Sequence, residues 1–247
     1  MKKHKICKIL LVILAIFLCV AFYELLGICV AYKKQPEVSN TTKKETKNGS
    51  WNECSENTER AVIIEKNPEA LLQRVRLIKN AKKEIILSTF AFQSDESGKL
   101  ILGALHDAAD RGVHIRLLVD GMESWIDMEG NPYFYGLSSH ENVEIKLYNK
   151  ANPLKPWKMM GRMHDKYLIA DGKRYILGGR NTYNYFLGDF PGHKNYDRDV
   201  LVVCDEPEKE NSVNQLLEYF ETIWEQEDSD YFHDNKKLAN RKSVKNA

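Results

Sequence analysis

Apolar residues follow three different patterns along this chain, and each pattern predicts a different structure. From Ile9 to Tyr32 they form a nearly unbroken run, and about two dozen apolar residues are enough for a helix to cross the hydrocarbon core of a bilayer. Residues 33–58 are polar and have no apolar period, which is typical of a flexible linker. From residue 59 to residue 228, short apolar runs alternate with segments of helical period. This part is therefore expected to be one globular domain of the α/β class.

Within the globular part, strands are expected at Ala61–Glu65, Glu84–Phe92, Val113–Asp120 and Val143–Tyr148. Helices are expected from the N-cap Asn67 to Lys83, at Gly98–Asp110 and at Asn211–Glu227. A strand, a helix and a strand of these lengths predict a parallel pair with a crossover helix. The looser stretch 121–162 is aromatic-rich, and it either binds acyl chains or the membrane interface or packs as a satellite of the core. The stretch 183–197 either covers the site and selects the leaving group or is a solvated connection.

A β-hairpin is predicted between residues 166 and 178. Lys166–Ala170 is mostly apolar, Asp171-Gly172 is a strong signal for a two-residue turn, and a second strand begins at Arg174.

Reactive side chains flank this hairpin. Because side chains alternate along a strand, His164 and Lys166 project to the same face. The return strand ends in Gly178-Gly179, where the missing Cβ atoms let a ligand approach the backbone, and Asn181 follows. These groups suit a phosphodiester substrate. Lys166 provides a positive charge, Asn181 provides N–H donors, and the His164 imidazole can attack phosphorus.

The spacing H-x-K-x4-D-x6-G-G-x-N, from His164 to Asn181, resembles the signature of the phospholipase D superfamily. Similarity extends to Leu87–Phe90, Arg111–Gly121 and Tyr196–Val200, which resemble the amino-terminal half of bacterial cardiolipin synthase-type members. The resemblance implies a phospholipase D-like α/β/α sandwich with a mixed, largely parallel sheet.

The resemblance also implies a role for each motif residue. His164 would be the nucleophile of a phosphohistidine intermediate, or its partner acid. Lys166 and Asn181, with the backbone at the glycine pair, would hold the phosphoryl oxygens. Asp199 would hydrogen-bond the imidazole and fix its tautomer, and Asp171 would support the turn. The resemblance implies no metal and no cofactor, because lysine and asparagine side chains neutralise the developing charge.

Members of this superfamily use two such motifs that face each other, and this chain contains one. The other histidines of the globular part have no lysine two residues later; they are His106, His114, His140, His193 and His233. A second lobe must therefore complete the site. It is either another copy of this chain, in a homodimer, or the missing half of a longer enzyme.

Composition and charge favour a membrane-tethered enzyme. The chain has 247 residues, 43% of them hydrophobic and 29% charged, with a formal net charge of +1, so no global feature marks a nucleic-acid binder. Lysines in the basic leader 1–8 precede the apolar run 9–32, which favours a single-pass anchor with a cytoplasmic amino terminus and an extracytoplasmic catalytic domain. A cleaved signal peptide is the alternative. Residues 229–247 are expected to be a polar, basic tail.

Five cysteines add little, since three lie in the leader and anchor. Cys54 and Cys204 can pair in principle, but unpaired thiols are favoured.

Three functions remain open. The first is a phosphodiester hydrolase or transferase on membrane phospholipids, either a phospholipase D or a cardiolipin synthase-type enzyme. The second is an anchored or exported phosphodiesterase on nucleic acid. It is supported modestly by basic residues around the site: Lys146, Lys150, Lys155, Lys158, Arg162, Arg174 and Arg180. The third is an inactive half-enzyme.

Overall fold

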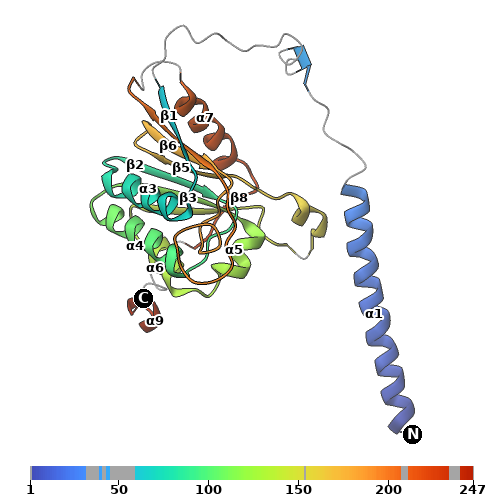
Figure 1. Cartoon of the computed structure of the whole chain (residues 1–247). Coiled ribbons are helices and arrows are strands. Elements are labelled where there is room, and N and C mark those ends of the chain that lie inside the picture. Colours follow the sequence, from blue (N-terminus) through green and yellow to red (C-terminus); the bar gives the residue numbers. More distant parts are fainter. Residues whose placement is uncertain are drawn as a thin grey trace. The chain divides into compact units, whose positions relative to one another are not determined.

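The computed structural model describes residues 2–31, 39–40, 43–44, 59–152, 154–206, 211–233 and 240–246. They belong to two compact units, which are residues 1–55 with 151–161, and residues 56–150 with 162–247. The second unit contains the sheet and all the expected site residues (Figure 1). The predicted linker lies mostly outside the described residues, and so does Cys54, while Cys204 is buried as a free thiol.

Eight strands form one sheet in the second unit. In chain order they are β1 (Glu59–Ile64), β2 (Glu84–Thr89), β3 (His114–Asp120), β4 (Val143–Tyr148), β5 (Lys166–Ala170), β6 (Arg174–Gly178), β7 (Asp199–Cys204) and β8 (Ser229–Tyr231). Among the described residues, the helices of this unit are α3 (Asn67–Asn80), α4 (Glu96–Asp110), α5 (Gly121–Asp127), α6 (Pro132–Ser138), α7 (Ser212–Trp224) and α9 (Lys242–Lys245). The first unit contains α1 (Lys2–Ala31) and the 3₁₀ helix η1 (Pro156–Met160).

The strand order is β1-β7-β6-β5-β2-β3-β4-β8. The predicted mixed sheet is confirmed, but the expectation that it is largely parallel is wrong. Only β2–β3 and β3–β4 are parallel, and the other five pairings are antiparallel. Strands β2, β3 and β4 are joined by helical crossovers, which parallel neighbours require. Strands β5, β6 and β7 follow one another without a crossover helix, and such connections permit antiparallel pairing. Strand β8 also lies beyond residue 228, so the domain extends into the predicted tail.

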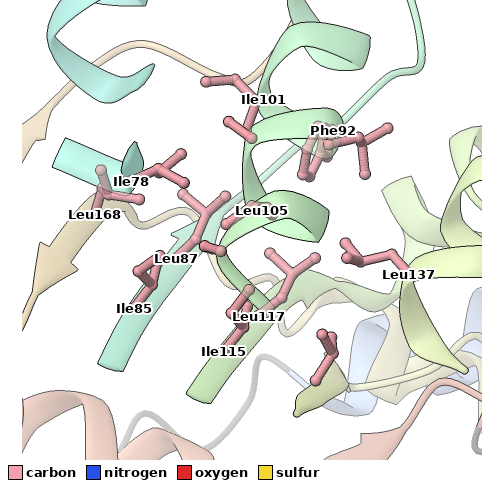
Figure 2. Packing of buried hydrophobic residues seen from close by; sticks show 14 of the residues in the cluster. Ile78, Ile85, Leu87, Phe92, Ile101, Leu105, Ile115, Leu117, Leu137 and Leu168 are labelled. Carbon is pink, nitrogen blue, oxygen red and sulfur yellow. The ribbon is translucent and has the colours of Figure 1, made fainter. Parts of the chain in front are cut away.

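Helices cover both faces of the sheet. Ile85 and Leu87 of β2 pack into a cluster with α3, α4 and α6, and Ile86 between them packs into a second cluster with α7. Figure 2 shows the first cluster, where Ile78 and Leu105 of the helices lie over the strand residues. The alternation of side chains on a buried strand thus produces the predicted three-layer α/β/α arrangement.

Local signals set the helix starts, with one correction. Helix α4 begins before the predicted Gly98 because the Asp95 carboxylate accepts a hydrogen bond from the Gly98 amide at 3.0 Å. Helix α3 has Lys66 at its N-cap, so the prediction that Asn67 caps it is wrong. The Asn67 side chain is instead buried and bonds two loop residues.

Both looser stretches, 121–162 and 183–197, contribute side chains to the hydrophobic core. Phe134, Tyr135 and Phe186 belong to the main hydrophobic core. Trp125 and Trp157 differ, since 64% and 37% of their surfaces are exposed.

Helix α1 contains the predicted anchor. An 18-residue window within its segment His4–Val30 has a mean hydropathy of 2.9, so α1 is long and apolar enough to cross a membrane by length and composition. A signal sequence near an amino terminus passes the same test.

Asp171 supports the hairpin turn and the neighbouring strand. Asp171 and Gly172 have φ values of 56° and 61°, as a tight hairpin turn with two left-handed residues requires. The Asp171 carboxylate accepts hydrogen bonds from the backbone amides of Lys82, Lys83 and Glu84 at 2.7–3.1 Å. It therefore joins the β5–β6 turn to the start of β2.

Replacing Asp171 with asparagine is expected to lower the free energy of unfolding by about 1–2 kcal/mol, because three amides lose a charged acceptor while the left-handed backbone stays accessible. Thermal unfolding of the full-length protein in a mild detergent measures this, with Asp205→Asn as the control. Asp205 pairs only with exposed Arg60 in the part of the chain that the structure describes. Equal midpoints for the two variants would contradict the structural role of Asp171.

Candidate active site

The ends of several strands meet at one edge of the sheet, and the reactive residues lie there. Thr89, the last residue of β2, is paired with Lys166, the first residue of β5. Gly178, which ends β6, is paired with Asp199, which begins β7. This register brings Lys166, the glycine pair and Asp199 to one end of the sheet, with His164 two residues before β5 and Asn181 three residues after β6. Asp171 lies at the opposite end of β5, away from the site.

His164 is exposed, and its ring contacts Phe90 edge to face, with the ring centroids 4.5 Å apart. Partial desolvation of the imidazole by the surrounding protein lowers the pKa of His164, and the positive charge of Lys166 lowers it further. A lowered pKa keeps the imidazole neutral near pH 7, which is the form that can attack phosphorus.

Lys166 is only 6% exposed, and its ammonium donates to the His164 carbonyl oxygen at 2.8 Å. Burial lowers the pKa of Lys166, and the carboxylates of Asp165 and Asp197 oppose that shift. A lysine ammonium has three donors, so further donors of Lys166 remain for a phosphoryl oxygen.

Asn181 is buried, and its Oδ1 accepts a hydrogen bond from the Ala91 amide at 3.3 Å. This contact turns the carboxamide so that its NH₂ group can donate elsewhere. The structure thus places His164, Lys166 and Asn181 at one end of the sheet, as the hairpin pattern predicted.

Asp199 does not form the expected hydrogen bond to His164. Its Oδ2 accepts from Arg74 at 2.9 Å and lies 3.2 Å from Arg180, and all three side chains are at most 5% exposed. Its Oδ1 is buried and has no hydrogen-bond partner among the described residues. Asp199 therefore neutralises two buried guanidinium groups, and sequence spacing alone could not show this.

The glycine pair also serves the chain itself. A Cβ atom on Gly178 would lie 2.0 Å from Oδ1 of Asp199, and a Cβ atom on Gly179 would lie 2.0 Å from Oδ2 of Asp197. Two of the chain's own carboxylates therefore require glycine at both positions, and the close approach of a ligand to this backbone stays a prediction.

Two supporting residues were not predicted from the sequence. The Asp120 carboxylate is buried and accepts hydrogen bonds from the Arg162 guanidinium at 2.9 Å and the Met163 amide at 3.1 Å. It fixes the segment that leads into His164. The Phe90 ring lies under the cations of Arg162 and Lys166, at 4.9 and 5.3 Å. A carboxylate at the last position of the buried strand 113–120 was the available signal for Asp120.

Metal-ligating side chains gather elsewhere. Among the described residues, His106, Asp107 and Asp110 on α4 have ligand atoms within 4.8 Å of one another, and all three are exposed. They are not part of the His164 site.

Two of the basic residues that supported nucleic-acid binding in the sequence are buried in the structure. Arg180 is 1% exposed and Lys146 is 9% exposed, so neither presents its charge to a nucleic acid. This weakens the modest electrostatic support for that function.

An α/β/α sandwich with His164, Lys166 and Asn181 at one end of its sheet defines a protein of the phospholipase D class. The family model described as "Cardiolipin synthase, PLD-like domain" matches residues 74–224, which is more than half of the chain. The chain therefore belongs to this family, within the phospholipase D superfamily, whose members are generally enzymes.

Known proteins agree with this assignment. Cardiolipin synthase C of Escherichia coli K12 is 29% identical over 171 residues, which are 64% of this chain and 34% of that protein. The chain spans about a third or less of the length of the curated relatives it matches. Among solved structures, phosphatidylserine synthase of Haemophilus influenzae Rd KW20 matches with a TM-score of 0.57 at 19% identity, covering 75% of this chain and 40% of that one. NucT from Helicobacter pylori matches with a TM-score of 0.54 at 16% identity, covering 70% of this chain and 99% of that one. The structural matches support the fold.

Proposed function

We propose that this chain is a membrane-anchored phosphodiesterase or phosphatidyltransferase that acts on phospholipids through a phosphohistidine intermediate. The observation that carries this proposal is the placement of His164, Lys166 and Asn181 at one end of the sheet. The apolar helix α1 and the cardiolipin synthase relatives support a lipid substrate. The proposed topology has a cytoplasmic amino terminus and an extracytoplasmic catalytic domain, as the basic leader favours.

In the proposed mechanism, Nε2 of one His164 attacks phosphorus in line with the headgroup oxygen. The phosphorus–oxygen bond breaks, and a second histidine, in the facing lobe, donates a proton to the leaving alcohol. That histidine then removes a proton from water or from another alcohol, which attacks phosphorus and releases His164. Lys166 and Asn181 hold the phosphoryl oxygens and stabilise the charge on them.

The facing lobe in this proposal is a second copy of the chain. Strand β1 is an edge of the sheet and exposes Val62 and Ile63. Two copies paired along β1 about a two-fold axis would run antiparallel, which places the two His164 residues at opposite ends of the joined sheet. The second copy must therefore approach the end of the sheet where His164 lies.

Co-production of the natural chain with a His164→Ala chain tests the shared site. If one site needs His164 from both copies, equal amounts are expected to lower total activity to about one quarter of the all-natural value, since only that fraction of random dimers has two histidines. A value near one half would mean that each chain acts alone. Lys173→Gln, at the distant turn, is the matched control partner for His164→Ala and should leave activity unchanged.

The substrate is tested with the full-length protein in vesicles that contain phosphatidylglycerol and phosphatidylethanolamine, and in parallel on single-stranded DNA. We expect release of a headgroup or formation of a transphosphatidylation product, and no cleavage of DNA. Cleavage of DNA alone would replace the lipid proposal with the nucleic-acid one. If neither substrate is cleaved, whether the protein is a dimer or a monomer, the chain is an inactive half-enzyme.

A further inference from the structure

A short segment of the first unit, residues 151–161, contacts the carboxyl-terminal part of α1. The Tyr23 hydroxyl donates a hydrogen bond to the Leu154 carbonyl oxygen at 3.0 Å. The Tyr23 and Trp157 rings meet edge to face, with their centroids 6.1 Å apart. The 3₁₀ helix η1, which contains Trp157, is therefore docked on the helix that contains the predicted anchor.

An apolar cavity of about 270 Å³ lies between these two elements, and its lining residues are Tyr23, Leu26, Gly27, Val30 and Trp157. The wall on the α1 side is the last part of a segment that is long and apolar enough to cross a membrane. Acyl chains surround such a helix in a bilayer. Because the cavity offers apolar surface at this place in the chain, the ligand that fits it is an acyl chain of a lipid.

The outer surface of the segment has the composition of a membrane-binding loop. Leu154 is 78% exposed and Met160 is 50% exposed. Lys155 and Lys158 lie between them and are also exposed. At a membrane surface, apolar side chains enter the acyl region while lysine ammonium groups stay with the lipid phosphates.

The backbone of the segment forms local hydrogen bonds, which a non-helical chain needs in lipid. The Asn152 side chain accepts from the Leu154 amide at 2.9 Å, and its carbonyl oxygen accepts from the Lys155 amide at 2.9 Å. The carbonyl oxygens of Lys155 and Lys158 accept from the amides of Lys158 and Gly161 at 2.9 and 3.0 Å. The segment can therefore enter the membrane surface with these backbone groups paired.

We propose that residues 151–161 form a lipid-binding loop that enters the membrane surface, docks on α1 and holds one acyl chain of a phospholipid between Trp157 and α1. Gly161 and His164 are three residues apart, which is at most about 10 Å of extended chain. The loop therefore ends close to His164, and the lipid that it holds is a substrate of that site. This last step rests on the proposed function, whereas the binding of the lipid does not.

The test is photolabelling of the full-length protein in phosphatidylglycerol vesicles. A fraction of the phosphatidylglycerol carries a photoreactive diazirine on one acyl chain, and mass spectrometry of peptides locates the labelled residues after illumination. We expect label on residues 151–161 as well as on α1.

Two variants test the docking on α1. Tyr23→Phe keeps the ring and removes the hydrogen bond to Leu154, and Trp157→Ala removes one wall of the cavity. Each is expected to lower the labelling of residues 151–161, relative to that of α1, by about threefold or more. Label on α1 shows that each variant still inserts. Trp125→Ala is the matched control, since Trp125 is also exposed but belongs to the second unit.

Label on α1 alone would overturn the inference. So would label on residues 151–161 that neither Tyr23→Phe nor Trp157→Ala lowers, or that Trp125→Ala lowers equally. If the loop is labelled as expected in a chain that turns over no phospholipid, the lipid-binding loop is upheld and the proposed function is rejected. Turnover of phospholipid by a chain whose loop stays unlabelled would have the opposite meaning.

Discussion

Replacing His164 with alanine is expected to lower the turnover of phospholipid at least about a thousandfold, which corresponds to about 4 kcal/mol of transition-state stabilisation. Without the imidazole, the proposed phosphohistidine intermediate cannot form, and in the proposed mechanism Lys166 and Asn181 only bind the phosphate. The fold should be unaffected because His164 is exposed and lies outside β5. Headgroup release by vesicle-reconstituted protein measures the loss.

His106→Ala is the matched control for this experiment. His106 is also exposed, but it lies on α4 and contacts Asp110 and His140. Its activity should equal that of the unaltered chain. Substantial turnover in His164→Ala, with both variants folded, would mean that another nucleophile performs the reaction.

Replacing Asp199 with asparagine keeps the size of the side chain and removes its charge. Among substitutions that preserve side-chain size in the described core, it is expected to lower the free energy of unfolding the most. It leaves the guanidinium groups of Arg74 and Arg180 buried without their counter-charge, and breaking a buried ion pair in this way costs about 3–5 kcal/mol. That is a large part of the stability of a typical domain. The unfolding midpoint should therefore fall by about 10 °C or more.

The comparison for Asp199→Asn is Asp205→Asn, which removes a carboxylate from an ion pair whose partners are 73% and 55% exposed. Such an exposed pair contributes little to stability, because water and salt screen it. Thermal unfolding in detergent should separate the two variants clearly. If they unfold together, Asp199 is not the counter-charge of the buried arginines, and a direct role beside His164 would return.

Much of the fold could be predicted because the hydrophobic pattern and the turn chemistry agree. The strand Val143–Tyr148 has the predicted bounds, and the Asp171-Gly172 turn lies where its residue types indicate. The direction of most strand pairs could not be predicted, since periodicity shows which residues form a strand and not which strand lies beside it. Strand β8 was missed because three residues of mixed polarity carry no periodic signal.

In the site, too, local patterns could be predicted and long-range contacts could not. His164, Lys166 and Asn181 were predicted because alternation and spacing place them at the end of one hairpin. The buried contacts of Asp199 and Arg180 were not predicted, since they join residues more than a hundred positions apart. Nothing in the local sequence separates a buried arginine that organises the fold from an exposed one that binds an anion.

The hairpin β5–β6 carries its chemistry at one end and its turn at the other. Lys173 lies next to that turn, and the five residues of β5 separate it from His164. Five extended residues span about 17 Å. A fluorophore or surface tether attached at residue 173 would leave the reactive end uncovered. Labelled copies could then report whether the chain assembles during an assay of phosphodiester cleavage.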